Sequence, residues 1–165
     1  MGKEQLLARL ESALPGQVDA EIIAQVSSEQ LTRFSNNTIH QNISELNSRI
    51  YVRVLAAGKT GTVITNSLEP RQLIGAVRRA LAATKLDSPR SSQPPLSPAT
   101  SYKSLQLHNQ ELAAQTPESR ARMVANPLAM AKSANMQAAG AFTGIEQELA
   151  IVNTRGLRAW TRATF

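Results

Sequence analysis

The chain has 165 residues, enough to bury roughly two-thirds of its surface, so it needs no disulfide or metal staple to fold. It contains no cysteine, which excludes disulfides and thiolate metal ligands and agrees with a reducing compartment. Its 18 basic and 12 acidic residues leave a net charge of +6, but only 4% of residues are aromatic, too few for a base-stacking platform for nucleic acid.

The first segment, MGKEQLLARLESAL, predicts an amphipathic helix over residues 3–14. Pro15-Gly16 ends this helix. Charged residues interrupt the apolar ones, so the segment is not a signal peptide. No apolar run approaches the ~20 residues that cross a bilayer. We therefore expect a cytoplasmic protein with no membrane contact. The apolar stripe of the helix consists of Leu6, Leu7, Leu10 and Leu14.

A strand is predicted over residues 18–27, because its apolar run is bounded by a turn and fits an internal position in a sheet. The stretch LTRFSNNTIHQN, residues 31–42, predicts a hairpin. Asparagine tolerates positive φ, so Asn36-Asn37 can form a two-residue turn. This register pairs Phe34 with Ile39, and both then face the core.

The other face of the same hairpin is predicted to be polar. The register pairs Arg33 with His40, and side chains alternate between the two faces of a strand. Ser35, Thr38 and Asn42 are expected on this face with Arg33 and His40. A polar face of this kind suits a binding surface, and it suits a solvated sheet face equally well.

Three further strands are predicted in quick succession. The second arm of the hairpin continues to about Leu46, a fourth strand covers residues 49–56, and a fifth covers residues 62–66. The sequence GKTG, residues 58–61, is predicted as the turn before the fifth strand. Short connections between successive strands indicate an antiparallel meander.

A helix is predicted over residues 69–86, with Ser67 or Asn66 as its cap and Pro70 in its first turn. The basic residues of this helix are expected to point away from the core. They are Arg71, Arg78 and Lys85. Its buried stripe is predicted to be Leu73, Ile74, Val77 and Leu81.

Residues 87–104 hold four of the eight prolines and many serines, and they predict an extended connector on the surface. Beyond it, Thr116-Pro117-Glu118 predicts the start of a helix that runs toward Asn135. Pro127 is expected to kink or split that helix. Three more strands are predicted, with the turn NTRG before the last; they cover residues 136–144, 147–153 and 157–165.

The fold class predicted from these elements is α+β. An antiparallel β-meander with helices on one face comes first, then the proline-rich connector, then a second helix with a β-hairpin. The expected domains are residues 1–86, 87–104 and 105–165. The last strand has no closing turn, so we expect the natural sequence to continue beyond Phe165. An unpaired strand there would also favour self-association.

Catalytic motifs are incomplete. GKTGT, residues 58–62, lacks the first glycine of a phosphate-binding loop and the helix that must follow. His40 and His108 are far apart, and neither lies at metal-ligand spacing from another histidine. No Gly-x-Ser-x-Gly elbow is present. We therefore predict no catalytic residue, no metal ligand and no cofactor in this chain.

Two stretches resemble the TldD/PmbA family, long described as modulators of DNA gyrase. The first is LTRFSNNTIHQNISE with the following RIYVRVLAAGKTGTVITNSLEPRQLIGAVRRALAATKL. The second is AAGAF with QELAIVNTRGLRAWTRATF, which is similar to a later hairpin of the family around an Asn-Ser-x-Gly turn. Here Asn153-Thr154-Arg155-Gly156 stands in that place. The pattern TRFSNNTIHQN is more similar to the PmbA branch.

The resemblance implies cytoplasmic proteases or peptide-maturation factors that act as homodimers, or as heterodimers with a paralogue, on peptide or protein substrates. One branch binds zinc through a His-Glu-x-x-x-His helix beyond the region matched here, and the other serves as a partner subunit. This chain would then be a non-catalytic amino-terminal domain beside a peptide chamber. The candidate substrate or interface residues are Arg33, Asn36, Asn37, His40, Asn42, Arg155 and Arg158.

Two other functions stay open from the sequence. The charge of +6 and the arginines of the tail, Arg155, Arg158 and Arg162, suit a nucleic-acid-binding module whose affinity falls steeply with salt. A plain structural or assembly module is the other alternative. Zinc bound by this chain alone would contradict the non-catalytic hypothesis, and a lack of DNA binding at low salt would contradict the nucleic-acid hypothesis.

Overall fold

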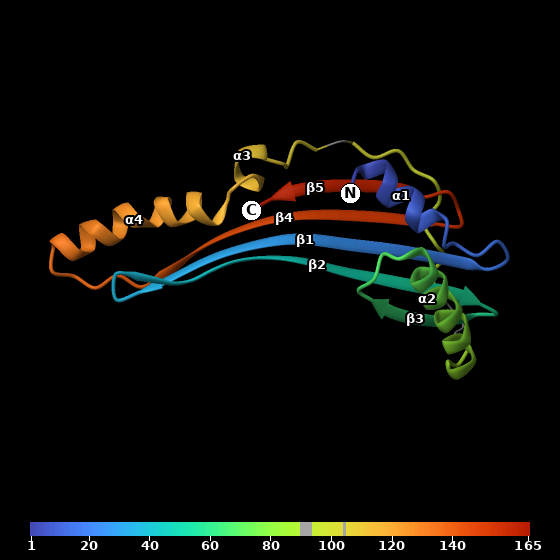
Figure 1. Ribbon diagram of the computed structural model, residues 1–165. Coiled ribbons are helices and arrows are strands. Elements are labelled where there is room, and N and C mark those ends of the chain that lie inside the picture. The colour runs from blue at the N-terminus through green and yellow to red at the C-terminus, as the bar shows by residue number, and fades with distance from the viewer. Residues whose placement is uncertain (90–93, 104) are drawn as a thin grey trace. The chain divides into compact units, whose positions relative to one another are not determined.

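Five strands pair in the order β3-β2-β1-β4-β5 in the computed structural model, which describes residues 1–89, 94–103 and 105–165 (Figure 1). The sheet and its helices confirm the α+β class. Consecutive strands β1, β2 and β3 form the predicted meander, and β4 with β5 forms the later hairpin on the other side of β1. The strands are β1 Asp19–Ser35, β2 Thr38–Ala56, β3 Lys59–Thr65, β4 Gly140–Asn153 and β5 Arg158–Thr164.

The strands are longer than the sequence pattern predicted. β1 joins the predicted strand 18–27 to the first arm of the hairpin, and β2 joins the second arm to residues 49–56. β4 likewise joins residues 147–153 to most of the strand predicted just before them. In β1 and β2 the joining residues are polar and break the apolar alternation. Backbone pairing with neighbouring strands continues through them regardless, because it does not depend on side-chain polarity.

Positive backbone φ angles mark the two tight turns of the meander. Asn36 and Asn37 have φ of 50° and 58°, which confirms the predicted hairpin turn. The next turn is Ala57-Gly58, with φ of 50° and 73°, and Ala56 pairs with Lys59. The predicted turn at residues 58–61 was therefore placed too late, because Lys59, Thr60 and Gly61 already belong to β3. Gly58 accepts the positive φ of the second turn position without strain. β3 begins at the next residue, Lys59.

The chain forms two compact units, and each draws on three separate segments. The first unit consists of Met1–Val26, Ser48–Leu105 and Glu148–Thr161. The second consists of Ser27–Asn47, Gln106–Gln147 and Arg162–Phe165. Both units therefore combine residues from 1–86 with residues from 105–165, because four of the strands contribute residues to each unit.

The first unit contains the main hydrophobic core. Helix α1, Lys3–Glu11, buries the predicted leucines Leu6, Leu7 and Leu10. Helix α2, Pro70–Ala83, continues into a 3₁₀ turn at Thr84–Leu86. The sheet residues beneath these helices are almost fully buried; they are Ala20, Ile22, Ala24, Ile50, Val52, Val54, Ala150 and Val152.

The buried side of α2 differs from the prediction. Leu73 and Val77 are buried as expected, but the other two buried residues of the helix are Ala76 and Ala80. Ile74 and Leu81 remain 36% and 38% exposed. The reason is a close approach between the helix and β3. A Cβ atom at Gly61 would lie 1.8 Å from the carbonyl oxygen of Ala80, so only small residues fit at this contact.

The start of α2 also corrects the predicted cap. The N-cap residue is Glu69, whose side chain makes no capping hydrogen bond, and Pro70 opens the helix as predicted. The Ser67 hydroxyl accepts a hydrogen bond from the Glu69 N–H at 3.2 Å. Ser67 therefore orders the turn before the helix, while proline fixes φ at the first helical position.

The described part of the proline-rich connector has no helix or strand, as predicted, but it is not wholly on the surface. Leu96 is only 2% exposed. The Ala99 N–H donates to the carbonyl of Arg155 at 3.2 Å. Residues 90–93 and 104 of the predicted connector lie outside the described residues.

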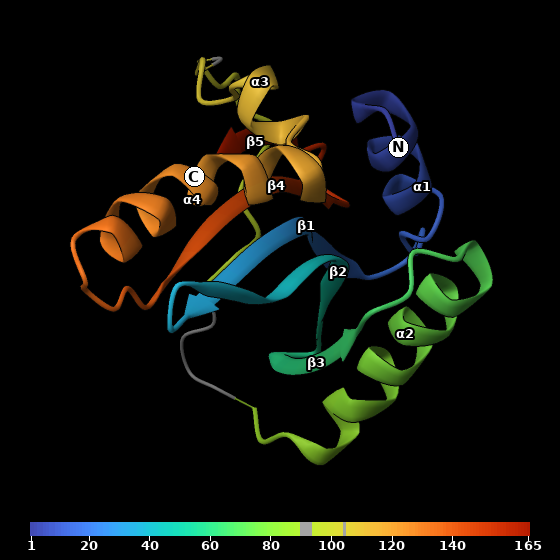
Figure 2. The same cartoon turned by 60° about the vertical axis from the view of Figure 1, so that its left-hand side comes forward.

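Helix α4, Pro117–Ser133, dominates the second unit (Figure 2). Thr116 caps it as predicted, and Pro127 does not split it. A short helix α3, Gln110–Ala113, comes before it and was not predicted. Leu107 pairs with Ala163 of β5, so the end of the last strand is not an unpaired edge. None of the helices in the described ranges has the length and apolarity to cross a membrane.

Candidate functional site

A completely buried arginine is the polar centre of the second unit. Arg120 of α4 is 0% exposed and is the largest fully buried side chain among the described residues. It follows the helical spacing of the other buried residues of α4, Val124 and Leu128. Arg120 was not among the residues predicted from the sequence. Its signal was an arginine at i−4 from Val124 and i−8 from Leu128, on the stripe that faces the sheet.

Arg120 is held entirely by neutral acceptors. Nε donates to Thr32 Oγ1 at 3.3 Å, and Nη1 donates to Gln30 Oε1 at 3.3 Å and to the Gln115 carbonyl at 3.4 Å. Nη2 donates to Asn42 Oδ1 at 2.9 Å and to two further groups. These are the Ile43 carbonyl and the Ser44 hydroxyl, at 3.0 and 3.2 Å. The fork of the guanidinium thus ties α4 to both β1 and β2.

Asn42 is a candidate site residue that this network explains. Its Oδ1 accepts hydrogen bonds from Arg120 and from Thr32 Oγ1 at 2.9 Å, and its Nδ2 donates to the Pro117 carbonyl at 2.8 Å. Both amide atoms of Asn42 therefore bond to α4 residues, Oδ1 to Arg120 and Nδ2 to Pro117. Asn42 thus positions the start of α4.

The residues predicted for one polar face of the hairpin do not all lie on the same face. Asn42 shares its face with Thr32, where both contact Arg120. Arg33 is the next residue after Thr32, so its side chain points to the opposite face. There it lies 3.5 Å from Gln41 Oε1. Asn42 therefore does not accompany Arg33, which corrects the predicted grouping. Of the residues predicted for this face, Arg33, Thr38 and His40 keep exposed side chains.

Asn36 and Asn37 have different roles in the hairpin turn. Asn36 is exposed and supplies only the turn conformation. Asn37 also bonds to the loop between α4 and β4. Its Nδ2 donates to the Met136 carbonyl at 2.9 Å, and its Oδ1 accepts from the Ala138 N–H at 2.7 Å. The second turn residue is thus a structural anchor for that loop.

A second polar cluster in the same unit surrounds Glu146 of β4. His108 Nε2 lies 2.8 Å from Glu146 Oε1, and Arg162 of β5 forms an ion pair with the same carboxylate oxygen. His108 belongs to the segment that pairs with β5 through Leu107. The sequence offered no second histidine at metal-ligand spacing from His108. In the structure His108 helps to hold this segment against the end of the sheet.

Arg155 belongs to the first unit and lies in the turn between β4 and β5. It forms an ion pair with Asp19 at 2.7 Å, and this hydrogen bond raises the pKa of Arg155. The preceding Asn153 is 4% exposed. Asn153 Oδ1 accepts from the Arg155 and Leu157 N–H groups, and its Nδ2 donates to the Ser97 carbonyl at 2.8 Å. The turn thereby fastens the connector.

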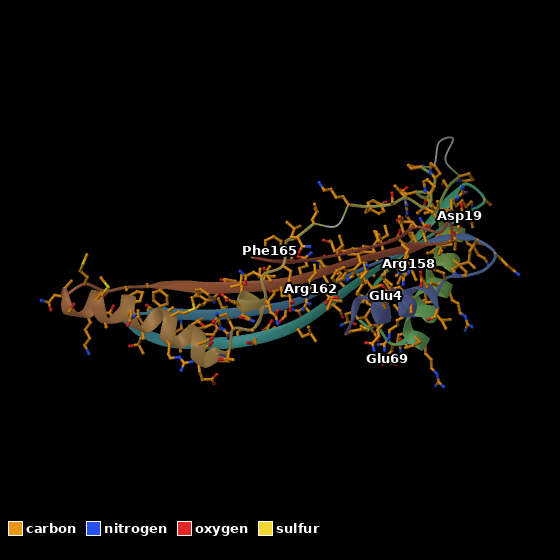
Figure 3. All side chains as sticks on the ribbon, turned by 90° about the horizontal axis from the view of Figure 1, so that it is seen from above. Glu4, Asp19, Glu69, Arg158, Arg162 and Phe165 are labelled. Carbon is orange, nitrogen blue, oxygen red and sulfur yellow. The ribbon has the colours of Figure 1, made fainter. Side chains whose placement is uncertain are left out.

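Arg158, also in the first unit, binds α1. It contacts Glu4 at 2.6 Å and Glu11 at 2.9 Å, and Glu4 and Arg158 lie together in Figure 3. The hydrogen bond from Arg158 lowers the pKa of Glu4, and the same bond raises the pKa of Arg158. Lys3 adds a cation–π contact, 5.8 Å from the ring centre of Trp160. Arg158 therefore secures α1 on β5.

The chemistry open to these clusters is limited. Within the ranges that the structure describes, no three histidine, cysteine, aspartate or glutamate side chains gather as metal ligands. Most candidate residues spend their polar atoms on other parts of the chain. Arg33, Asn36 and His40 are exceptions, since all three are exposed residues of one hairpin. They are the residues of the predicted set that remain accessible to a ligand.

The model of the family described as PmbA/TldA metallopeptidase domain 1 matches residues 20–84. No curated protein matches the sequence. The matched range begins in β1 and ends just after α2, so it covers the meander and the helix that packs on it.

Solved structures share the fold over 98% of this chain. TldE from Thermococcus kodakarensis is 22% identical with a TM-score of 0.80. Two candidate modulators of DNA gyrase, from Thermotoga maritima and Bacteroides thetaiotaomicron, are 18% and 17% identical with TM-scores of 0.74 and 0.73. The chain covers 36%, 36% and 38% of those three chains, so it spans a little over a third of their length.

Proposed function

We propose, on the premise that residues 20–84 carry the first-domain pattern of the TldD/PmbA family, that this chain is the amino-terminal domain of a peptide-processing protein. The domain itself is non-catalytic and binds no zinc. It contributes to assembly of a dimer, formed with a second copy or with a paralogue, and to the access of peptide substrates. Zinc, where the protein uses it, belongs to another part of the protein.

One observation carries this proposal. The family pattern in β1, β2, β3 and α2 coincides with a fold that 98% of the chain shares with TldE from Thermococcus kodakarensis. The internal use of Asn37, Asn42, Arg155 and Arg158 supports a scaffold role, because side chains engaged within the fold are not free to perform chemistry.

A peptide-access role falls to two accessible side chains, Arg33 on the first arm of the hairpin and His40 on the second. Both lie near the Asn36-Asn37 turn, and both are exposed. A guanidinium and an imidazole can donate hydrogen bonds to the carbonyl groups of an extended peptide, independently of its side chains. This suits a domain that guides peptides of varied sequence.

Metal analysis and a hydrolysis assay test the non-catalytic part. The purified chain should hold no stoichiometric zinc after exposure to zinc and desalting, and it should not cleave an unstructured fluorogenic peptide. Either stoichiometric zinc or cleavage of the peptide would contradict the proposal. For peptide access, a photo-crosslinking residue at position 33 or 40 should capture a labelled unstructured peptide, and the same residue at exposed Glu69 should not. Equal capture at all three positions would contradict that role.

The nucleic-acid alternative is not favoured. The arginines that suggested it, Arg155, Arg158 and Arg162, each form an ion pair with an acidic side chain of the same chain. A phosphate would have to displace those carboxylates, so the tail does not offer the free positive patch that polyanion binding uses.

A further inference from the structure

The outer side of α2 carries a regular stripe that the hydrophobic core does not use. The stripe alternates cationic and apolar side chains at spacings of three and four residues, and Lys85 at its end lies in the 3₁₀ turn that follows α2. Its five residues are Arg71, Ile74, Arg78, Leu81 and Lys85. All five are exposed, and we call them the α2 seam. Figure 2 shows α2 beside β3, with its other side turned away from the strands.

The spacing of the α2 seam is that of a helix–helix contact. Alternating steps of three and four residues average 3.5, which is the repeat that keeps one stripe of a helix facing a partner helix. Single exposed apolar residues are common on protein surfaces and need no explanation. Here Ile74 and Leu81 are seven residues apart, and a cation occupies each of the other three seam positions.

The charges of the seam select the partner. Helix α2 contains no acidic residue, and the seam has three cations. Two copies of the seam would place like charges opposite one another, which disfavours a second copy as the partner. A helix with acidic side chains opposite Arg71, Arg78 and Lys85 would neutralise these charges, and its apolar side chains would cover Ile74 and Leu81.

A membrane and a nucleic acid fit the seam less well. Two of the four large apolar side chains of α2, Leu73 and Val77, are already buried in the core. The two apolar seam residues are separated by Arg78, so the helix lacks the continuous apolar face of an interfacial membrane helix. A phosphate backbone would pair with the cations but leave Ile74 and Leu81 facing water.

We propose that the α2 seam docks an acidic amphipathic helix of a partner protein. Gly75, which flanks the seam, supports close approach of such a helix. A Cβ atom there would meet only the end of the Arg79 side chain, at 3.4 Å, so the fold itself does not require glycine at this position. Glycine in a helix interior costs about 1 kcal/mol relative to alanine, and it leaves a flat surface beside the stripe. This inference does not depend on the proposed peptide-processing role.

A synthetic helix tests the proposal directly. The probe is a fluorescein-labelled helical peptide of about three heptads. Glutamate and leucine alternate along one side of it, at steps of three and four residues. Fluorescence anisotropy should show saturable binding to the full chain. Arg78→Glu should weaken this binding about tenfold. Arg79→Glu makes the same charge change about 100° around the helix, outside the seam, and should change the affinity less than about twofold.

A second pair of variants tests the apolar positions. Ile74→Ser should weaken peptide binding several-fold, whereas Ile64→Ser, at a 59% exposed position on β3, should leave it unchanged. Circular dichroism should show that all variants stay folded, because the replaced side chains are exposed.

Four results would overturn the proposal. They are the absence of saturable binding, equal losses from Arg78→Glu and Arg79→Glu, equal binding of a peptide with lysine in place of glutamate, and tighter seam-dependent binding to phosphatidylglycerol vesicles or duplex DNA than to the peptide.

Discussion

Arg120 Nη2 and Asn42 Oδ1 are joined by a 2.9 Å hydrogen bond at a site where the arginine is completely buried. The bond links α4 to β2, and the two bonded residues are 78 positions apart in the chain. A buried cation must have its donors satisfied, because an unpaired buried charge is strongly unfavourable. The position of α4 in the second unit therefore depends on a few neutral acceptors.

Removing either partner should destabilise the protein. Asn42→Ala leaves a buried guanidinium without one acceptor and should lower the free energy of unfolding by about 2 kcal/mol. Arg120→Met leaves several acceptors unpaired and should cost about 3 kcal/mol. Urea denaturation followed by circular dichroism measures both values. His40→Ala, at an exposed position, should stay within about 0.5 kcal/mol of the original chain. Equal stability of all three variants would mean that the network contributes nothing.

The two residues of the hairpin turn should respond oppositely to glycine. Both have positive φ, which glycine adopts without strain. Asn36→Gly should therefore be neutral or slightly stabilising. Asn37→Gly gains the same backbone freedom but loses the hydrogen bonds to Met136 and Ala138, so it should destabilise by about 1 kcal/mol. Thermal unfolding of the two variants side by side checks this, and a larger loss for Asn36→Gly would show that the assigned roles are wrong.

Gly61 should not tolerate alanine. The added Cβ would lie 1.8 Å from the Ala80 carbonyl oxygen and 2.9 Å from the Thr84 nitrogen, so α2 would have to move away from β3. We expect a loss of about 3 kcal/mol or more, in the range of overpacked cores. Gly16→Ala is the matched control, because nothing lies within 4 Å of a Cβ there. Chemical denaturation of both variants gives the comparison.

The contact between Glu4 and Arg158 should make stability depend on pH. The hydrogen bond from Arg158 lowers the pKa of Glu4 below its ordinary value of 4.5. The folded state therefore binds a proton on Glu4 less readily than the unfolded state does. The stabilisation is fully present above the unfolded pKa, and it is lost as the pH falls through the folded pKa.

Glu4→Gln tests this dependence. The variant should be less stable than the original chain near pH 7, and the difference should shrink as the pH falls below 4.5, where Glu4 becomes protonated. Urea midpoints across this pH range give the measurement. Glu69→Gln removes a carboxylate from another exposed position and serves as the control. A difference that stays constant with pH would exclude the ionised carboxylate as the cause.

Local signals in the sequence were enough to predict several elements of the fold correctly. Thr116-Pro117 starts α4 because a capping hydroxyl and a first-turn proline act within a few residues of each other. Asn36-Asn37 forms a turn because asparagine accepts positive φ. The leucine spacing of α1 likewise predicted its buried side. Each of these features depends on neighbours along the chain, so the sequence alone determined it.

The lengths of the strands could not be predicted from the sequence and were determined by the tertiary structure. The polar residues within β1 and β2 interrupt the apolar alternation, and from the sequence they indicated ends of strands. In the sheet these residues stay extended because their backbone groups pair with neighbouring strands, including β4, which follows much later in the chain. Periodicity within one segment contains no information about such a partner.

The candidate site was also decided by contacts between distant residues. The sequence grouped Asn42 with Arg33, but Arg120, from a helix far along the chain, lies against the face of Asn42 and Thr32. Contacts between distant residues also decided which side of α2 is buried, where the helical spacing of apolar residues predicted burial of Ile74 and Leu81. The close approach of Gly61 to Ala80 admits only small residues at this contact. Ala76 and Ala80 are therefore buried, while Ile74 and Leu81 stay exposed in the α2 seam.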